Sequence, residues 1–272
     1  MNYRHIYHAG SFADVFKHTL LVALIEALQK KSTPFCVLDT HAGIGLYPLL
    51  SKEAQKKREY DHGIIQLINV SSTSLPDTIQ HYLSIVKSYN QDSELNNYPG
   101  SPAIIRHLLC DHDKMILCEL HASDIQLLKN LFAKDRQVAV HHTDGYLGLK
   151  AFLPPKERRG LVLIDPPFET KDEWTKIDRG MQKALHRWKN GIYAIWYPIK
   201  KQLMAGNFSE KLTHYQLPYL KIEFFLNNAT DITSLTACGM IILNPPWQLK
   251  EKLTDSVLPC LGKILDARWT IS

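Results

Sequence analysis

The sequence lacks paired cysteines. Its five cysteines form no C-x-x-C motif and their number is odd: Cys36, Cys110, Cys118, Cys238 and Cys260. A zinc site or a disulfide framework usually needs such pairs, so we expect reduced thiols in a cytosolic protein. The chain is rich in histidine, with 13 residues, but contains no H-E-x-x-H spacing. We therefore predict no metal site.

The sequence also lacks an apolar run long enough to span a bilayer, a signal-peptide pattern, an internal repeat and a low-complexity segment. We expect a cytoplasmic protein that has no membrane partner. The 272 residues are 45% hydrophobic and 22% charged, which is ordinary for a globular protein of one large domain or two small ones. The net charge of +5 is a mild lean towards anionic partners, although many enzymes that bind no nucleic acid share it.

Residues 161–168, LVLIDPPF, end a short apolar run with an acid, two prolines and an aromatic residue. Four consecutive apolar residues are typical of a strand that is buried on both faces of a parallel sheet. A pair of prolines cannot continue the ladder, so we expect the chain to leave the sheet at Asp165. Open α/β sheets bind their ligands at the carboxyl ends of strands, which makes Asp165 a candidate site residue.

The residue types after this strand suit a planar base that carries an exocyclic amine. The carboxylate of Asp165 can accept one N–H of the amine, the carbonyl of Pro166 can accept the other, and the ring of Phe168 offers a stacking face. A base that is taken out of its stack needs such an arrangement. In the alternative interpretation, the acid merely caps the next helix while the prolines end the strand, and this stretch alone does not separate the two.

Other predicted strands also end in acids. Residues 35–38 lead to Asp39 and a small-residue loop, residues 114–119 end at Glu119, and residues 138–140 lead to Asp144 and Gly145. Parallel strands of this kind, each followed by a helix, predict a doubly wound α/β sheet with these acids along one edge.

Three later segments complete the predicted sheet. The last two have little helix between them, so we predict that the sheet finishes antiparallel: residues 191–196, 220–226 and 239–243. Residues 49–97 are polar and helix-like and interrupt the alternation of strand and helix. We interpret them as a helical insertion within a single domain that covers residues 1–272.

The amino-terminal arm, residues 1–11, crowds aromatic and basic residues together, among them Tyr3, Arg4 and His5. Interleaved rings and positive charges suit stacking on bases and contact with phosphates. The alternative is an ordered strap that packs on the domain.

Together these segments resemble S-adenosylmethionine-dependent methyltransferases of the seven-stranded Rossmann-like type. The tetrapeptide 165–168 resembles the [DNS]-P-P-[FYW] signature of amino-methyltransferases. A second match begins at Asn244, but the signature belongs after the fourth core strand, and this order favours Asp165. Phe168 stands where tyrosine is commoner in the family that the chain resembles more closely.

That family is RlmJ, whose members are bacterial enzymes that methylate the N6 of an adenine in 23S ribosomal RNA. The chain is similar to it from the first residues to about Leu261 in these blocks: YRHIYHAGSFADVFKH, LDTHAGIGLY, YPGSP, RRGLVLIDPPF, YAIWYP and GMIILNPPW. The resemblance implies a mostly parallel sheet with an antiparallel last strand, a small inserted helical subdomain, S-adenosylmethionine as methyl donor and large-subunit ribosomal RNA as partner. We expect a monomer.

The resemblance also implies roles for single residues. Asp165 is the implied catalytic acceptor, together with Pro166 and Phe168. The residues implied to bind the cofactor are His18, His41, Ser101, Glu119, Asp144, Gly145 and Asp165. Those implied to bind the substrate are Tyr3, Lys17 and Phe168.

Three rival functions stay open at this point. A protein-glutamine N5 methyltransferase that acts on a translation factor or ribosomal protein uses a similar loop, typically with asparagine first. A nicotinamide-dependent dehydrogenase would need a complete G-x-G-x-x-G, and Pro48 stands in the place of its third glycine. A non-catalytic RNA-binding module would explain the amino-terminal arm but not the acids at several strand ends.

Overall fold

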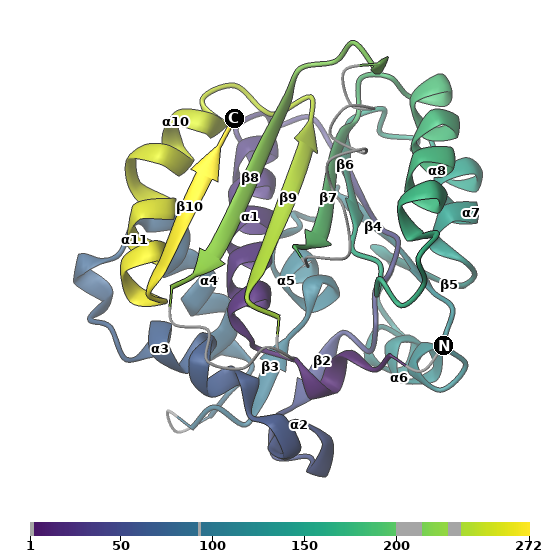
Figure 1. Ribbon diagram of the computed structural model, residues 1–272. Helices are drawn as coiled ribbons and strands as arrows, with labels where there is room; N and C mark the ends of the chain where they lie inside the picture. The colour runs from purple at the N-terminus through teal and green to yellow at the C-terminus, as the bar shows by residue number, and fades with distance from the viewer. Residues whose placement is uncertain (1–2, 92–93, 200–213, 228–234) are drawn as a thin grey trace.

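An eight-stranded sheet forms the centre of the protein in a computed structural model, which describes residues 3–91, 94–199, 214–227 and 235–272 (Figure 1). From one edge to the other the strands follow the order β10, β8, β9, β7, β6, β1, β4, β5. In chain order their bounds are β1 Cys36–Asp39, β4 Lys114–Glu119, β5 Val138–His142, β6 Gly160–Ile164, β7 Ile192–Pro198, β8 Tyr219–Leu226, β9 Ala237–Leu243 and β10 Ala267–Ile271.

Five neighbouring strands, β5, β4, β1, β6 and β7, run parallel. Strand β1 lies between β4 and β6, with Asp39 in register with Leu117 and Leu163. Every residue of β1 and β6 is buried, as their apolar runs predict. The register places the carboxyl ends of these strands, and the acids that follow them, along one edge of the sheet.

The other end of the sheet is antiparallel. Strand β9 pairs antiparallel with both β7 and β8, and β10 pairs antiparallel with β8. The predicted α/β class and Rossmann-like sheet are confirmed, but the predicted count of seven strands was one too low. The additional strand, β10, is an edge strand whose residues alternate between half-buried and exposed, so it has no continuous apolar run.

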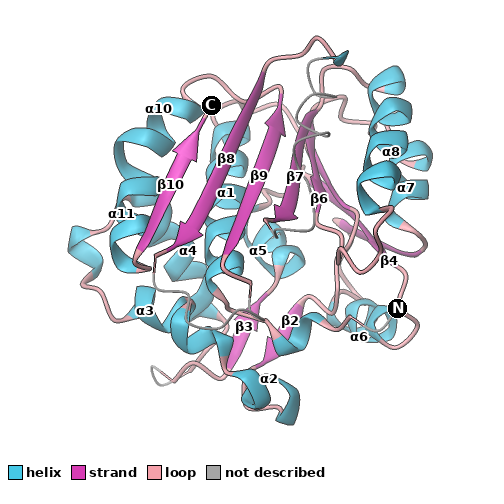
Figure 2. Ribbon diagram, viewed as in Figure 1, coloured by secondary structure: helices cyan, strands magenta, loops and turns pink. Residues whose placement is uncertain are grey.

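Helices cover both faces of the sheet (Figure 2). Side chains of α1, α4, α5 and α11 pack in one apolar core with one face of the sheet, and those of α7 and α8 pack in a second core with the other. The bounds of the helices in the parallel half are α1 Phe12–Gln29, α5 Ser101–Leu108, α6 Asp124–Leu131, α7 Gly145–Ala151 and α8 Glu173–Arg187. At the carboxyl end of the chain they are α10 Leu249–Lys252 and α11 Leu258–Ile264, joined by a π-helical turn.

Between α1 and α5 the chain also forms a second, two-stranded sheet of β2 Leu46–Pro48 and β3 Asn97–Pro99. The segment between these two strands contains α2 Lys52–Lys57, α3 Ile64–Ile68 and α4 Asp77–Ser88. Helix α4 packs against α1. Over the described ranges, no helix combines the length and apolar character that a membrane span requires.

Candidate functional site

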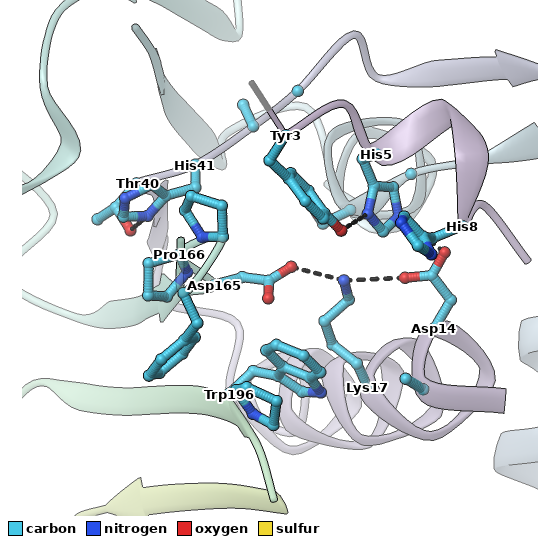
Figure 3. A pocket seen from close by; sticks show the side chains of 18 of the residues that line it. Tyr3, His5, His8, Asp14, Lys17, Thr40, His41, Asp165, Pro166 and Trp196 are labelled. Carbon is cyan, nitrogen blue, oxygen red and sulfur yellow. Dashed lines mark hydrogen bonds and ion pairs between the residues drawn. The ribbon is translucent and has the colours of Figure 1, made fainter. Parts of the chain in front are cut away.

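Loops at the carboxyl ends of β1, β4, β5 and β6 surround a cavity of about 660 Å³ with help from the amino-terminal arm and α1 (Figure 3). All of the site residues predicted from the sequence line it: Tyr3, Lys17, His18, His41, Ser101, Glu119, Asp144, Gly145, Asp165, Pro166 and Phe168. Their individual roles stay predictions. No group of three His, Cys, Asp or Glu side chains in the described part of the chain is placed to hold a metal ion.

Lys17 links α1 to the end of β6. Its Nζ lies 2.5 Å from Asp165 Oδ2 and 2.9 Å from Asp14 Oδ1 (Figure 3). Its side chain is only 5% exposed. Burial favours the neutral amine, but the two carboxylates outweigh it and hold the pKa of Lys17 well above its ordinary value. Lys17 is therefore a buried ammonium that fixes the position of the Asp165 carboxylate.

Asp14 connects this ion pair to the amino-terminal arm. Its Oδ2 accepts from the Gly10 amide and lies 2.9 Å from His5 Nε2. Burial alone would raise the pKa of Asp14, yet His5 and Lys17 hold it well below its ordinary value. Sequence analysis did not identify Asp14 as a site residue. The available signal was its spacing of three residues from Lys17, which places both on one face of a helix.

The amino-terminal arm packs on the domain through Tyr3, His5 and His8. The Tyr3 ring stacks on His8 with 3° between the ring planes, and its hydroxyl lies 2.9 Å from His5 Nδ1. The Tyr3 amide donates to the Glu169 carboxylate, beyond the D-P-P-F segment. The arm therefore both packs on the domain and places an aromatic ring at the cavity.

Phe168 follows the two prolines with φ near +49°, in the left-handed region, so the chain turns sharply here. Its ring packs edge-on against Trp174 and Trp196, with centroid distances of 5.1 and 6.3 Å. Lys17 Nζ lies 5.8 Å from the centre of the Trp196 ring. Trp196 lies on β7 and was not among the predicted site residues. These rings form an apolar wall beside Asp165.

Glu119, at the end of β4, is braced by two backbone amides. Its Oε2 accepts from Gly43 at 2.8 Å and its Oε1 from His121 at 2.6 Å. Burial nevertheless raises the pKa of this carboxyl. Gly43 has φ near +62°, and a Cβ there would lie 2.2 Å from the Tyr47 hydroxyl, so any other residue would be strained at this position. A braced carboxylate at this strand end can hold vicinal hydroxyl groups.

Asp144 begins α7 by accepting from the Tyr146 amide at 2.7 Å. A Cβ on Gly145 would lie 2.1 Å from the Thr40 carbonyl, so this glycine allows the β1 and β5 loops to approach closely. His41 meets the Tyr146 ring edge-on at 5.3 Å, and burial lowers the pKa of His41 to about 4. This side of the cavity thus has a flat aromatic boundary and an uncharged imidazole.

Asp39, at the end of β1, has no cationic partner at hydrogen-bond distance within the described ranges. Its Oδ2 accepts from Ser101 Oγ at 2.7 Å and its Oδ1 from the His41 amide at 3.2 Å. Burial raises the pKa of Asp39 to about 7, although both hydrogen bonds lower it. The Asp39 carboxyl group is therefore protonated in a large fraction of the molecules near neutral pH.

Asp39→Asn should make the protein more stable near pH 7 but not near pH 4. Between these pH values the unfolded chain releases the Asp39 proton while the folded protein retains it, so this group makes stability fall as pH rises from about 4 to about 7. Asparagine does not titrate, so the variant avoids this loss of folding stability, which corresponds to about 2 to 4 kcal/mol at pH 7.5. Urea unfolding at pH 4 and 7.5 measures the difference. Parallel pH profiles for the two proteins would contradict it.

The second D-P-P-like motif lies at the opposite edge of the sheet. Asn244 follows β9, whose last residue, Leu243, pairs with Tyr193 near the start of β7. The Asn244 amide group donates to the carbonyls of Lys189 and Gly191, and Trp247 is 82% exposed. Strand order had favoured Asp165 over Asn244 as the site residue, and only Asp165 lines the cavity.

Comparisons with known proteins agree with the fold and identify a family that matches most of the chain. The model of a family described as "Ribosomal RNA large subunit methyltransferase D, RlmJ" matches residues 32–270. "Ribosomal RNA large subunit methyltransferase J" of Escherichia coli (strain K12) is 42% identical over 96% of this chain and 92% of its own length. The protein of the same description from Haemophilus influenzae is 40% identical over 100% of this chain and 98% of its own length.

A solved structure has the same fold along nearly the whole chain. Protein LPL1258 from Legionella pneumophila superposes with a TM-score of 0.90 at 35% identity, and the alignment covers 97% of this chain and 98% of that one. The similarity therefore includes the helical segment between β2 and β3 as well as the sheet. None of these relatives is described as a glutamine methyltransferase or a dehydrogenase.

Proposed function

Because this chain belongs to the RlmJ family of large-subunit ribosomal RNA methyltransferases, we propose that it methylates the exocyclic N6 of an adenine in 23S ribosomal RNA, with S-adenosylmethionine as the methyl donor. The observation that carries the proposal is the position of Asp165, Pro166 and Phe168. They follow the central strand β6 and line the same cavity as Glu119, which ends β4, and Asp144, which follows β5. The protein-glutamine alternative is not favoured by these comparisons.

The cavity residues fit S-adenosylmethionine. Gly43 allows close backbone approach, Glu119 can accept from ribose hydroxyls, and His41 with Tyr146 bounds a flat slot beside Asp144 for an adenine ring. His18 lines the cavity with a buried Nε2 that has no hydrogen-bond partner among the described residues, as expected of a group that meets a ligand. When bound, the cofactor supplies a methyl group on a positively charged sulfur.

The residues of the D-P-P-F segment then act on the target base. The amine of adenine is a poor nucleophile because its lone pair is delocalised into the ring. We propose that Asp165 and the Pro166 carbonyl accept its two N–H groups, which favours a pyramidal nitrogen with an available lone pair. Phe168 stacks on the flipped base and keeps its plane fixed. Positioning and electrostatic stabilisation supply most of the rate increase.

Lys17 supports this arrangement by occupying Oδ2 of Asp165. A carboxylate has a second oxygen, and this oxygen accepts the amine N–H in the proposal. The proton leaves the nitrogen after methylation, when the nitrogen is more acidic, and passes to Asp165 or to water. Asp165 therefore acts mainly as an oriented acceptor and need not be a strong base.

We propose further that the amino-terminal arm contacts the RNA around the target base. Tyr3 lines the cavity, and so do Lys57 of α2 and Lys176 of α8, whose ammonium groups suit flanking phosphates. In this proposal residues 49–97 form a helical insertion within a single domain, and the enzyme acts as a monomer in the cytoplasm.

A labelled-methyl assay tests the proposed activity. The purified protein is incubated with labelled S-adenosylmethionine, ribosomal proteins and protein-free large-subunit RNA from cells that lack it. We expect the label in the RNA fraction. Label only in the protein fraction would favour the glutamine alternative and contradict the proposal.

Phe168→Leu is expected to lower kcat/KM for RNA by about tenfold to a hundredfold, because stacking on a base contributes about 1 to 3 kcal/mol and leucine keeps bulk but has no ring. The matched control is Trp247→Leu in the second proline-pair motif, which should change kcat/KM less than about twofold because its ring lies away from the cavity. Similar losses in both variants would argue against a stacking role for Phe168.

A further inference from the structure

Three buried side chains form a chain of hydrogen bonds from the cavity to the helical segment between β2 and β3. His18 Nδ1 lies 2.7 Å from the Tyr98 hydroxyl, and this hydroxyl lies 2.8 Å from the Tyr82 hydroxyl. His18 is on α1, Tyr98 on β3 and Tyr82 on α4. The two tyrosines are fully buried and His18 is 1% exposed. Figure 1 shows α4 beside α1.

His18 is uncharged in this setting. Burial lowers its pKa well below the ordinary value, and the nearby Lys17 and His5 lower it further, whereas Asp14 acts in the opposite direction. A neutral imidazole has one nitrogen that donates and one that accepts. The direction of the hydrogen bonds in the chain therefore decides which nitrogen carries the proton.

Counting protons selects one direction. If Tyr82 donates to Tyr98 and Tyr98 donates to His18 Nδ1, both hydroxyl protons have acceptors and the imidazole proton lies on Nε2. In the reverse direction the Tyr82 proton needs an acceptor, and none is placed for it among the described residues. Buried hydroxyl groups without an acceptor are costly, so the first direction is favoured. It leaves a single unmet donor, the Nε2–H of His18, at the cavity.

The surroundings of this donor suit an anion. Gly100 and Ser101, at the amino end of α5, also line the cavity, and Tyr98 precedes them by two residues. Helix α5 has no side-chain cap, so the amides of Ser101 and Ala103, on either side of Pro102, and the positive end of its dipole are available to a negative group. Two independent features, a buried N–H donor and an uncapped helix end, thus belong to the same part of the cavity.

We infer that Tyr98 and Tyr82 are positioning residues that hold the His18 proton on Nε2, and that this N–H binds the carboxylate at the amino-acid end of S-adenosylmethionine. The identity of the ligand rests on the proposed function, whereas the proton position does not. The ammonium group at the same end of the ligand cannot accept an N–H, which leaves the carboxylate as the partner. The inference also gives α4 a part in cofactor binding, because Tyr82 supplies the first proton of the chain.

Binding of two nucleosides tests the ligand contact. S-adenosylhomocysteine has the amino-acid end and 5′-methylthioadenosine lacks it. Calorimetry on Tyr98→Phe should show S-adenosylhomocysteine bound about tenfold more weakly, as expected for a weakened hydrogen bond to a charged group, with 5′-methylthioadenosine unchanged. Tyr82→Phe should show a smaller loss of the same selectivity. Tyr193→Phe, which removes another buried hydroxyl that donates to the Trp188 carbonyl at 2.7 Å, should show none.

Equal losses for both nucleosides in Tyr98→Phe, or no loss, would overturn the inference, because a purely structural role does not distinguish the two ligands. If the wild-type protein binds neither nucleoside, the proposed function fails instead. Nitrogen NMR of histidine-labelled protein without ligand tests the proton position separately. We expect His18 to carry its proton on Nε2 in the wild type and to lose this preference in Tyr98→Phe. A proton on Nδ1 in the wild type would overturn the assignment.

Discussion

Asp165→Ala is expected to lower kcat for methyl transfer by about a thousandfold, because the variant loses the acceptor that is proposed to orient the target amine. Binding of S-adenosylhomocysteine should stay within about threefold of the wild type, since the other residues proposed to hold the cofactor, His18, Glu119 and Asp144, are unchanged. Single-turnover transfer to RNA measures the first quantity and calorimetry the second.

The variant should remain folded. Lys17 pairs with two carboxylates, and in the variant it still has Asp14, whose Oδ1 lies 2.9 Å from the Lys17 Nζ. Asn244→Ala, at the first position of the second proline-pair motif, is the matched control and should retain transfer per folded molecule. Turnover by Asp165→Ala above about a tenth of the wild-type rate would remove Asp165 from the mechanism.

Lys17→Met is expected to have the second-largest effect, on both stability and activity. The ammonium is 5% exposed between two carboxylates, and its removal leaves Asp14 with His5 and the Gly10 amide as partners. Breaking a buried ion pair from one side costs about 3 kcal/mol or more. Asp165 also loses the contact that fixes its position, so we expect kcat/KM to fall by about a hundredfold.

Lys252→Met is the control that separates the effect of breaking a buried ion pair from the effect of losing one positive charge. Lys252 lies 2.7 Å from Glu26, but its side chain is 36% exposed and far less enclosed than that of Lys17. Exposed ion pairs contribute about 1 kcal/mol or less, so this variant should unfold at nearly the wild-type urea concentration and retain activity. If Lys17→Met loses no more stability than Lys252→Met, the buried pair does not hold the site together.

Much of the site could be predicted because it depends on strand ends. An apolar run that stops at an acid is visible in the sequence, and parallel strands bring their carboxyl ends to one edge whatever the side chains between them. Glu119, Asp144 and Asp165 therefore line one cavity, as the pattern predicts, and Asp39 lies directly behind it, hydrogen-bonded to the lining residue Ser101. The helix-rich character of residues 49–97 was also visible, because their polar composition interrupts the alternation of strand and helix.

The rest depends on tertiary contacts that have no local signal. Asp14 resembles an ordinary residue of a first helical turn until the fold places His5 and Lys17 against it. Trp196 belongs to an apolar strand and Tyr98 to a turn-like segment, so neither looked like part of a site. Strand β10 was missed because an edge strand needs only one buried face.

Nucleoside analysis of the labelled RNA tests the central claim most directly. Large-subunit RNA from cells that lack the protein is methylated with the purified enzyme, digested to nucleosides and separated by chromatography with mass detection. The account predicts label in N6-methyladenosine, because Asp165, the Pro166 carbonyl and Phe168 are proposed to hold a base with an exocyclic amine. Label in adenosine methylated on a ring carbon, or in a uridine, which has no exocyclic amine, would contradict it.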